Sequence, residues 1–242
     1  YWWRVTAVND HGQTRNERGP RHFRFDPQVV NHVPIMEDEA AQEGRLLVSA
    51  KADGTPQPEV GELQIAPNVT PGTDRRGREE GALAFDGLHS KVVYAVRRFP
   101  LCDYTAAIRV CPEGIPKDGY QQIVSAWAAP MDDPLRIVIE GRKVFARIEA
   151  GDAYSTEGFE LQNGEWRHVA AVKEGELLRL YIDGDAVGSC QVPQFLATAA
   201  RNIAIGANPN YSELEGLEGK LDDFAFYGRA LSEEEIRAIC DE

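Results

Sequence analysis

Apolar and polar residues alternate in short runs along most of this chain, and Gly, Pro, Asn and Asp residues separate the runs. Alternation with a period of two is the pattern of a strand with one buried face. Many short strands joined by turns are typical of an antiparallel sandwich or jelly roll. The pattern therefore predicts an all-β fold, an antiparallel β-sandwich of the jelly-roll type. The predicted strands cover residues 44–50, 60–65, 82–85, 91–94, 104–110, 122–128, 135–140, 143–149, 159–161, 166–173, 177–182, 185–190, 202–205 and 221–227.

The last predicted strand is followed by a short helix. Ser232 and Glu235 have the spacing of a capping box, in which each side chain bonds the other residue's backbone N–H. A short C-terminal helix is therefore expected from Ser232 onward. Strict alternation in the strand would put one set of residues on one face, Leu221, Asp223, Ala225 and Tyr227, and the other set opposite, Asp222, Phe224 and Phe226.

The N-terminal part of the chain has a different pattern. Residues 1–27 predict a small hairpin, with a first strand near residues 1–7, turn residues at 9–12 and a second strand at 22–25. This segment resembles the last two strands of a fibronectin type III module. Residues 28–43 mix Pro, acidic and small residues without periodicity, which indicates a linker, and residues 44–242 form the sandwich domain. Because the chain starts in the middle of a predicted strand and without Met, we expect it to be a piece of a longer protein.

Five sequence blocks, in order, resemble the LamG-like jelly-roll modules of the concanavalin A-like lectin/glucanase superfamily. They are GALAFDG (Gly81–Gly87), EWRHVAAV (Glu165–Val172), LRLYIDGDAVGS (Leu178–Ser189), IAIGANP (Ile203–Pro209) and GKLDDFAFYGRALSEEEIRAIC (Gly219–Cys240). The resemblance implies a non-catalytic carbohydrate-binding or adhesion module of a larger secreted or cell-surface protein. Its partner would be a glycan or an extracellular protein. Two alternatives stay open: an architectural spacer, or an accessory domain of an extracellular enzyme whose catalytic part lies outside this fragment.

Catalytic motifs are absent from the sequence. Glycoside hydrolases of this superfamily carry E-x-D-x-x-E or a form one residue shorter on one strand, which places an acid and a nucleophile beside the glycosidic bond. Neither this motif nor G-x-S-x-G or H-E-x-x-H occurs. His168 lies in the EWRHVA block, where we expect a structural role. No catalytic residue is predicted.

A structural calcium ion is the metal that the resemblance implies. Asp222 corresponds to the aspartate on the final strand that holds calcium in several members of the superfamily, with backbone carbonyls as most other ligands. Some of these carbonyls come from the loop after the opening strand, here Asp86 and Gly87. The alternative is that Asp222 and Asp223 are a solvated pair at a sheet edge.

Three polar loops are candidates for ligand binding, because sugar sites combine an aromatic ring with amide and carboxylate partners. The candidate residues are Asn208, Asn210, Tyr211, Asp132, Asp133 and Tyr154. The alternative is that these are ordinary polar loops. Trp127 and Trp166 lie within predicted strands, and we expect them in the core.

The composition narrows the choice of partners and location. The formal net charge is −13, so clustered Arg and Lys for nucleic-acid binding are not expected. No run of 18 apolar residues occurs, so no membrane span is predicted. The resemblance implies an extracellular or cell-surface location, where the four cysteines could form disulfides. The pairing of the cysteines stays open, and the alternative is that all four are thiols.

Overall fold

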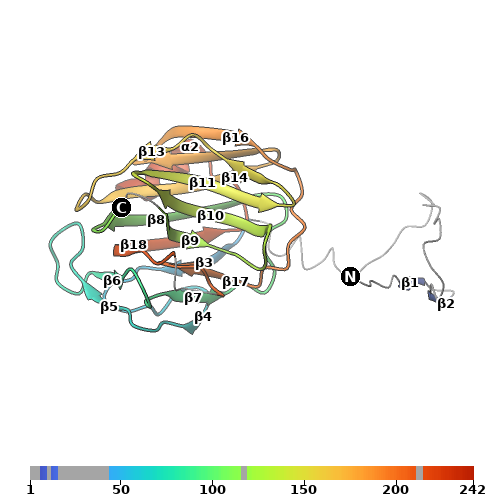
Figure 1. Ribbon diagram of the computed structural model, residues 1–242, viewed down its shortest axis with the longest axis horizontal. Coiled ribbons are helices and arrows are strands. Elements are labelled where there is room, and N and C mark those ends of the chain that lie inside the picture. Colours follow the sequence, from blue (N-terminus) through green and yellow to red (C-terminus); the bar gives the residue numbers. More distant parts are fainter. Residues whose placement is uncertain (1–5, 10–11, 16–43, 116–118, 211–214) are drawn as a thin grey trace. The chain divides into compact units, whose positions relative to one another are not determined.

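The computed structural model describes residues 6–9, 12–15, 44–115, 119–210 and 215–242 (Figure 1). The chain divides into two compact units, Tyr1–Ala41 and Gln42–Glu242. In the first unit, β1 (Thr6–Asn9) pairs antiparallel with β2 (Gly12–Arg15). The chain therefore reverses directly after Asn9, and the second strand predicted at residues 22–25 lies outside the described residues. The fibronectin type III resemblance of this unit rests on the sequence alone and stays a prediction.

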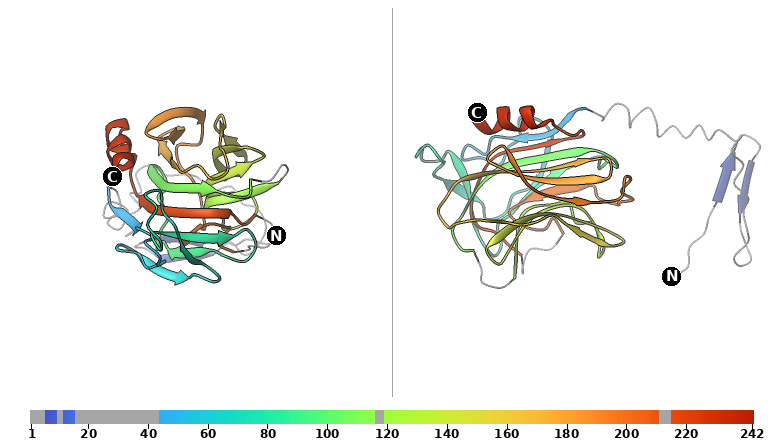
Figure 2. Two further views of the ribbon diagram at one scale, coloured as in Figure 1. Left: turned by 90° about the vertical axis from the view of Figure 1, so that its left-hand side faces the viewer. Right: turned by 90° about the horizontal axis from the view of Figure 1, so that it is seen from above.

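The second unit is a sandwich of two antiparallel sheets (Figures 1 and 2). Neighbouring strands of the first sheet are, in order, β12 (Ala153–Ser155), β11 (Lys143–Ala150), β10 (Asp132–Glu140), β9 (Tyr120–Ser125), β17 (Asn202–Ile205), β7 (Val92–Ala95) and β4 (Glu62–Ile65), while β13 (Phe159–Glu160) also pairs with β11. In the second sheet the order is β16 (Asp185–Gln191), β15 (Leu177–Ile182), β14 (Arg167–Glu174), β8 (Tyr104–Pro112), β18 (Glu218–Tyr227), β6 (Ala82–Asp86) and β5 (Thr70–Gly72), while β3 (Leu46–Ala50) also pairs with β18. The predicted all-β antiparallel sandwich is confirmed.

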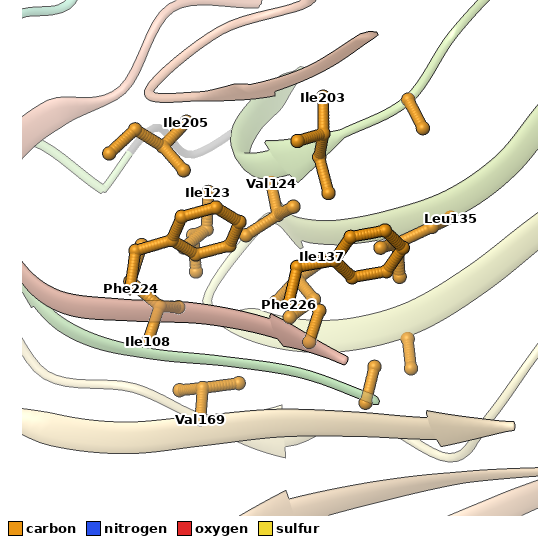
Figure 3. Packing of buried hydrophobic residues seen from close by; sticks show 14 of the residues in the cluster. Ile108, Ile123, Val124, Leu135, Ile137, Val169, Ile203, Ile205, Phe224 and Phe226 are labelled. Carbon is orange, nitrogen blue, oxygen red and sulfur yellow. The ribbon is translucent and has the colours of Figure 1, made fainter. Parts of the chain in front are cut away.

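The core lies between the two sheets. Figure 3 shows side chains of both sheets meeting there, among them Ile137 and Ile203 from the first sheet and Ile108 from the second. Phe226 of β18 packs among other rings, with its centroid 5.3 Å from that of Phe99 and 6.1 Å from that of Tyr104. Burial of these apolar side chains is the main stabilising contribution to the fold.

A β-bulge in β18 changes the predicted alternation. The register shifts between Asp222 and Ala225, and Asp223 has a positive φ of 48°. The bulge inserts a residue, so Leu221 and Phe224 both face the core, although strict alternation placed them on opposite faces. The prediction of two fixed faces along this strand is therefore wrong.

Helix α2 (Glu233–Asp241) is the only helix among the described residues. The capping box is present: Ser232 Oγ accepts from the Glu235 N–H, and the Glu235 carboxylate accepts from the Ser232 N–H. Leu231 and Ile236 pack with Ala170 and other residues on the outer face of the second sheet. The predicted short C-terminal helix is confirmed, and it covers part of one outer face of the sandwich (Figure 2).

Three further predictions can be compared with the structure. Trp127 follows the end of β9 and Trp166 precedes β14, so both lie outside the strands, and both are half-buried rather than in the core. That prediction was wrong because β9 ends before Trp127 and β14 begins after Trp166, so each strand is shorter at that end than the apolar pattern suggests. No disulfide joins any of the four cysteines in this structure, which is the alternative that the sequence left open.

Candidate functional site

The candidate site is built on the outer face of the first sheet, on β9, β10 and β11. Leu135, Ile137 and Ile139 of β10 face the core, so the residues between them point outward. The strand register aligns these outward residues in rows with their neighbours: Arg147 with Arg136, Phe145 with Val138 and Gln122, and Glu140 with Tyr120. We call Tyr120, Gln122, Arg136, Glu140, Arg147, Glu149 and Glu215 the outer-face cluster.

Arg136 is the centre of this cluster. Its Nη1 lies 2.7 Å from Glu149 Oε1, its Nη2 lies 3.3 Å from Glu215 Oε2, and its Nε lies 3.4 Å from Asp133 Oδ2. Gln122 Nε2 also donates to Glu215 Oε2, at 2.6 Å. Because only 11% of the Arg136 side chain is exposed, its ion pairs with Glu149 and Glu215 are less screened by solvent than pairs on an open surface.

An exposed aromatic ring lies beside the cluster. Tyr120 is 39% exposed, and the guanidinium carbons of Arg136 and Arg147 lie 5.9 and 5.7 Å from its ring centroid. Arg147 also lies 4.5 Å from the centroid of the Phe145 ring and pairs with Glu140. The hydrogen bond from Arg147 keeps the pKa of Glu140 below its usual value, so this carboxylate stays ionised. The result is a flat ring bordered by ionised groups.

Buried polar atoms without partners lie in and next to the cluster. Gln122 is 0% exposed, and its Oε1 has no hydrogen-bond partner. Asp133 is also buried and accepts from Ser125 Oγ and the Ala126 N–H, each at 3.2 Å. Burial raises the pKa of Asp133 to about 8, although Arg136 acts in the opposite direction. The neutral carboxyl is therefore favoured at neutral pH.

The predicted ligand-binding residues fall into two groups in the structure. Asn210 and Asp132 meet at the turn after β9: Asn210 Nδ2 donates to the Trp127 carbonyl at 2.7 Å, and the Ala128 N–H donates to the Asp132 carbonyl at 2.8 Å. Asn208 lies beside them, because its Oδ1 accepts from the Asn210 N–H at 3.2 Å. These residues form one rim of the first sheet.

Asn208 is buried, so only Asn210 and Asp132 reach the surface at this rim, and the other predicted ligand-binding residues do not add exposed groups to it. Asp133 is buried under the turn after β9. Tyr154 is half-buried on β12 and packs against the hydrophobic core. Tyr211 lies outside the described residues.

The structure separates the residues predicted to bind calcium. Asp86 pairs with Glu218 of β18, and Asp222 is four residues farther along the same strand, or roughly 13 Å away. Asp86 Oδ1 accepts from the backbone of Leu88 and from Ser90 Oγ. Although burial opposes ionisation, these hydrogen bonds hold the pKa of Asp86 well below its usual value, so its carboxylate caps the turn that contains Gly87.

Asp222 has the environment of a carboxylate that a cation would stabilise. It is buried, and its Oδ1 accepts one hydrogen bond from the Asp223 N–H, at 3.0 Å. Burial, together with the nearby carboxylates of Asp223, Asp53 and Asp74, raises the pKa of Asp222 to about 7. Among the described residues, no three His, Cys, Asp or Glu side chains come together in a way that could hold a metal. A calcium ion would therefore depend on Asp222 and backbone oxygens, and the site stays a prediction.

Sequence reasoning missed Tyr120, Arg136, Arg147 and Glu149 as functional candidates. A signal was present in β10 and β11. In these strands the residues that alternate with the apolar ones are mostly long and charged, and not short and polar. The contact between Arg136 and Glu215 joins residues 79 positions apart and could not be read from the pattern.

The two packed antiparallel sheets define a sandwich with a lectin-like fold. Residues 86–237 match the family model Laminin_G_3, described as the concanavalin A-like lectin/glucanases superfamily. The match covers more than half of the chain, which therefore belongs to this superfamily. No curated protein matches the chain.

Solved structures that share the fold include binding domains of botulinum neurotoxins and of a mosquitocidal protein. The botulinum neurotoxin serotype G binding domain is 13% identical with a TM-score of 0.64, and the alignment covers 81% of this chain and 50% of that chain. The binding domain of Paraclostridial Mosquitocidal Protein 1 is 16% identical with a TM-score of 0.63, covering 81% and 51%. The binding domain of botulinum neurotoxin DC, in complex with SialylT, is 10% identical with a TM-score of 0.63, covering 81% and 50%. This chain thus spans about half the length of these proteins, and the likeness shows the fold alone.

Long apolar helices are not found in the described part of the chain, where no helix could cross a membrane.

Proposed function

We propose that residues 42–242 form a non-catalytic carbohydrate-binding module, and that the outer-face cluster is its binding site. The observation that carries the proposal is the exposed Tyr120 ring beside Arg136, Arg147 and their carboxylate partners. A sugar presents an apolar face that stacks on an aromatic ring and hydroxyl groups that bond to polar side chains at its edge. The binding domain in complex with SialylT supports sugar binding as a use of this fold.

We also propose a role for the module within a longer protein. A carbohydrate-binding domain in a longer secreted or surface protein would anchor that protein to glycans. Binding of an extracellular protein instead, or a spacer role without any ligand, would appear in the test below as the absence of sugar binding.

The test is a glycan and polysaccharide array with the complete 242-residue chain, followed by titration of the best ligand. Tyr120→Ala should weaken binding by about 3- to 10-fold, because an aromatic stacking contact contributes about 0.5–1.5 kcal/mol. Tyr120→Phe keeps the ring and should bind nearly as well as the wild type.

Phe195 supplies the matched control. It is 65% exposed and outside the cluster, so Phe195→Ala should leave affinity unchanged. Equal affinity of the wild type and Tyr120→Ala would show that sugars bind elsewhere, and no binding to any sugar would refute the proposed function.

A further inference from the structure

Both terminal nitrogens of Arg136 and two nitrogens of Arg147 already contact protein groups. Arg136 contacts Glu149, Glu215 and Asp133, as described above. Arg147 Nε donates to Ser155 Oγ at 3.1 Å, and its Nη2 donates to Glu140. A ligand carboxylate or sulfate that approached either arginine would therefore meet the glutamates already paired with it.

Acceptors, in contrast, are available. Gln122 helps to hold Glu215 in place, because its Nε2 donates to Glu215 Oε2, whereas its own Oε1 is buried out of a ligand's reach. The side-chain hydrogen bonds found among the described residues use only Oε1 of Glu149 and only Oε2 of Glu215. The second oxygen of each carboxylate can accept, so the cluster has room for groups that donate hydrogen bonds.

Carboxylates outnumber the arginines on this face. Arg136 and Arg147 face three glutamates, Glu140, Glu149 and Glu215. The neighbouring Lys143 is exposed, but it lies between Glu140 of β10 and Glu160 of β13 in the strand register. No cation of the cluster is left uncompensated, while the chain as a whole carries −13.

We infer that the outer-face cluster binds neutral, hydroxyl-rich sugars and discriminates against sialylated, uronic and sulfated ones. The inference rests on the proposed function and adds the ligand class. Hydroxyl groups supply donors for the second carboxylate oxygens of Glu149 and Glu215, whose side chains are 24% and 16% exposed. An acidic sugar brings like charge to the glutamates and finds no free cation, and like-charge contacts at an interface are costly. This preference differs from what the neurotoxin DC binding domain holds in its complex.

The experiment measures affinity for matched pairs of ligands with the complete chain. The pairs are the same glycans with and without terminal sialic acid, and the same polysaccharide with and without sulfation. We expect the acidic member to bind at least about tenfold more weakly, as a like-charge cost of about 1.4 kcal/mol gives. Affinity for the neutral member should change little with ionic strength, because no ligand charge is involved.

Glu149→Gln tests the cause of the discrimination. This variant removes one negative charge and releases Arg136 Nη1, so it should bind acidic sugars better than the wild type does. Glu165→Gln is the matched control, because Glu165 pairs with Arg167 beside the second sheet, at 2.9 Å, away from the cluster. Melting temperatures of both variants establish that each is folded.

The outcomes separate this inference from the proposed function. Equal or tighter binding of the acidic members would overturn the inference and leave sugar binding intact. So would a Glu149→Gln variant that still rejects acidic sugars as strongly as the wild type. No binding to either member of any pair would refute the proposed function, and the inference with it.

Discussion

Lys173 is a buried lysine whose side chain contributes to the stability of the domain. It is 0% exposed, and its ammonium donates to three backbone carbonyls, those of Cys102, Gly175 (2.7 Å) and Gln194 (2.9 Å). These carbonyls belong to three separate segments: the start of β8, the turn between β14 and β15, and the loop after β16. The ammonium therefore joins three segments, although burial lowers the pKa of this lysine.

Lys173→Met keeps the apolar stem and removes the ammonium. Three carbonyls then lose a charge-assisted hydrogen bond, each of which contributes about 1.5–3 kcal/mol. Removing the buried charge also recovers its desolvation cost, so the sum is an upper limit. We expect a net loss of about 3–5 kcal/mol in the free energy of unfolding, which corresponds to a fall in Tm of roughly 6–20 °C for a domain of this size.

Urea denaturation followed by tryptophan fluorescence measures this loss. Lys143→Met is the matched control, because Lys143 is exposed on β11 and should change stability by less than about 0.5 kcal/mol. A loss below about 1 kcal/mol for Lys173→Met would refute the reasoning, since three buried carbonyls cannot be left unpaired at so low a cost.

Two further predictions concern the outer face of the second sheet. If calcium binds at Asp222, calcium chloride should raise the Tm of the wild type above its value in chelator, whereas Asp222→Asn should show no such rise; identical calcium dependence in both would exclude this site. Burial lowers the pKa of His168 to about 4, with Arg109 acting in the same direction, so from about pH 6.5 down to pH 4 only the unfolded state gains the proton. The free energy of unfolding should thus fall across this range by up to about 3 kcal/mol. His168→Gln should show a shallower fall than the wild type in urea titrations at pH 7 and pH 5. An equal fall in the variant and the wild type would contradict this.

The fold could be predicted from the sequence because each strand depends on local alternation and each turn on local residue types. The tight turns illustrate this, since Gly141 and Gly184 have φ angles of 59° and 88°, as hairpins with Gly at these positions require. β5 was missed because Thr70, Pro71 and Gly72 carry no strand signal, and the strand exists only through its pairing with β6.

The site could be predicted only in part, because it depends on long-range contacts. Asn208, Asn210 and Asp132 were predicted because amides and carboxylates in loops are typical of sugar sites, and a binding role for them stays a prediction. Arg136 was not found, because its role depends on Glu149 and Glu215, and the sequence does not show which carboxylates the register brings beside it. The bulge at Asp223 is a similar case, since it moves Asp222 without any change in the residue pattern.

The outward-facing residues of the two sheets explain why one face is a candidate for binding. On the second sheet, small residues such as Ala107 and Ala170 point outward, and Leu231 and Ile236 pack on them. Small side chains allow a helix to approach closely, and the contact removes this part of the sheet from solvent. On β10 and β11 of the first sheet the outward positions hold long charged residues, which cannot be covered in the same way without losing their hydration. The same alternating pattern therefore builds a surface for a helix on one side of the sandwich and a polar face for a ligand on the other.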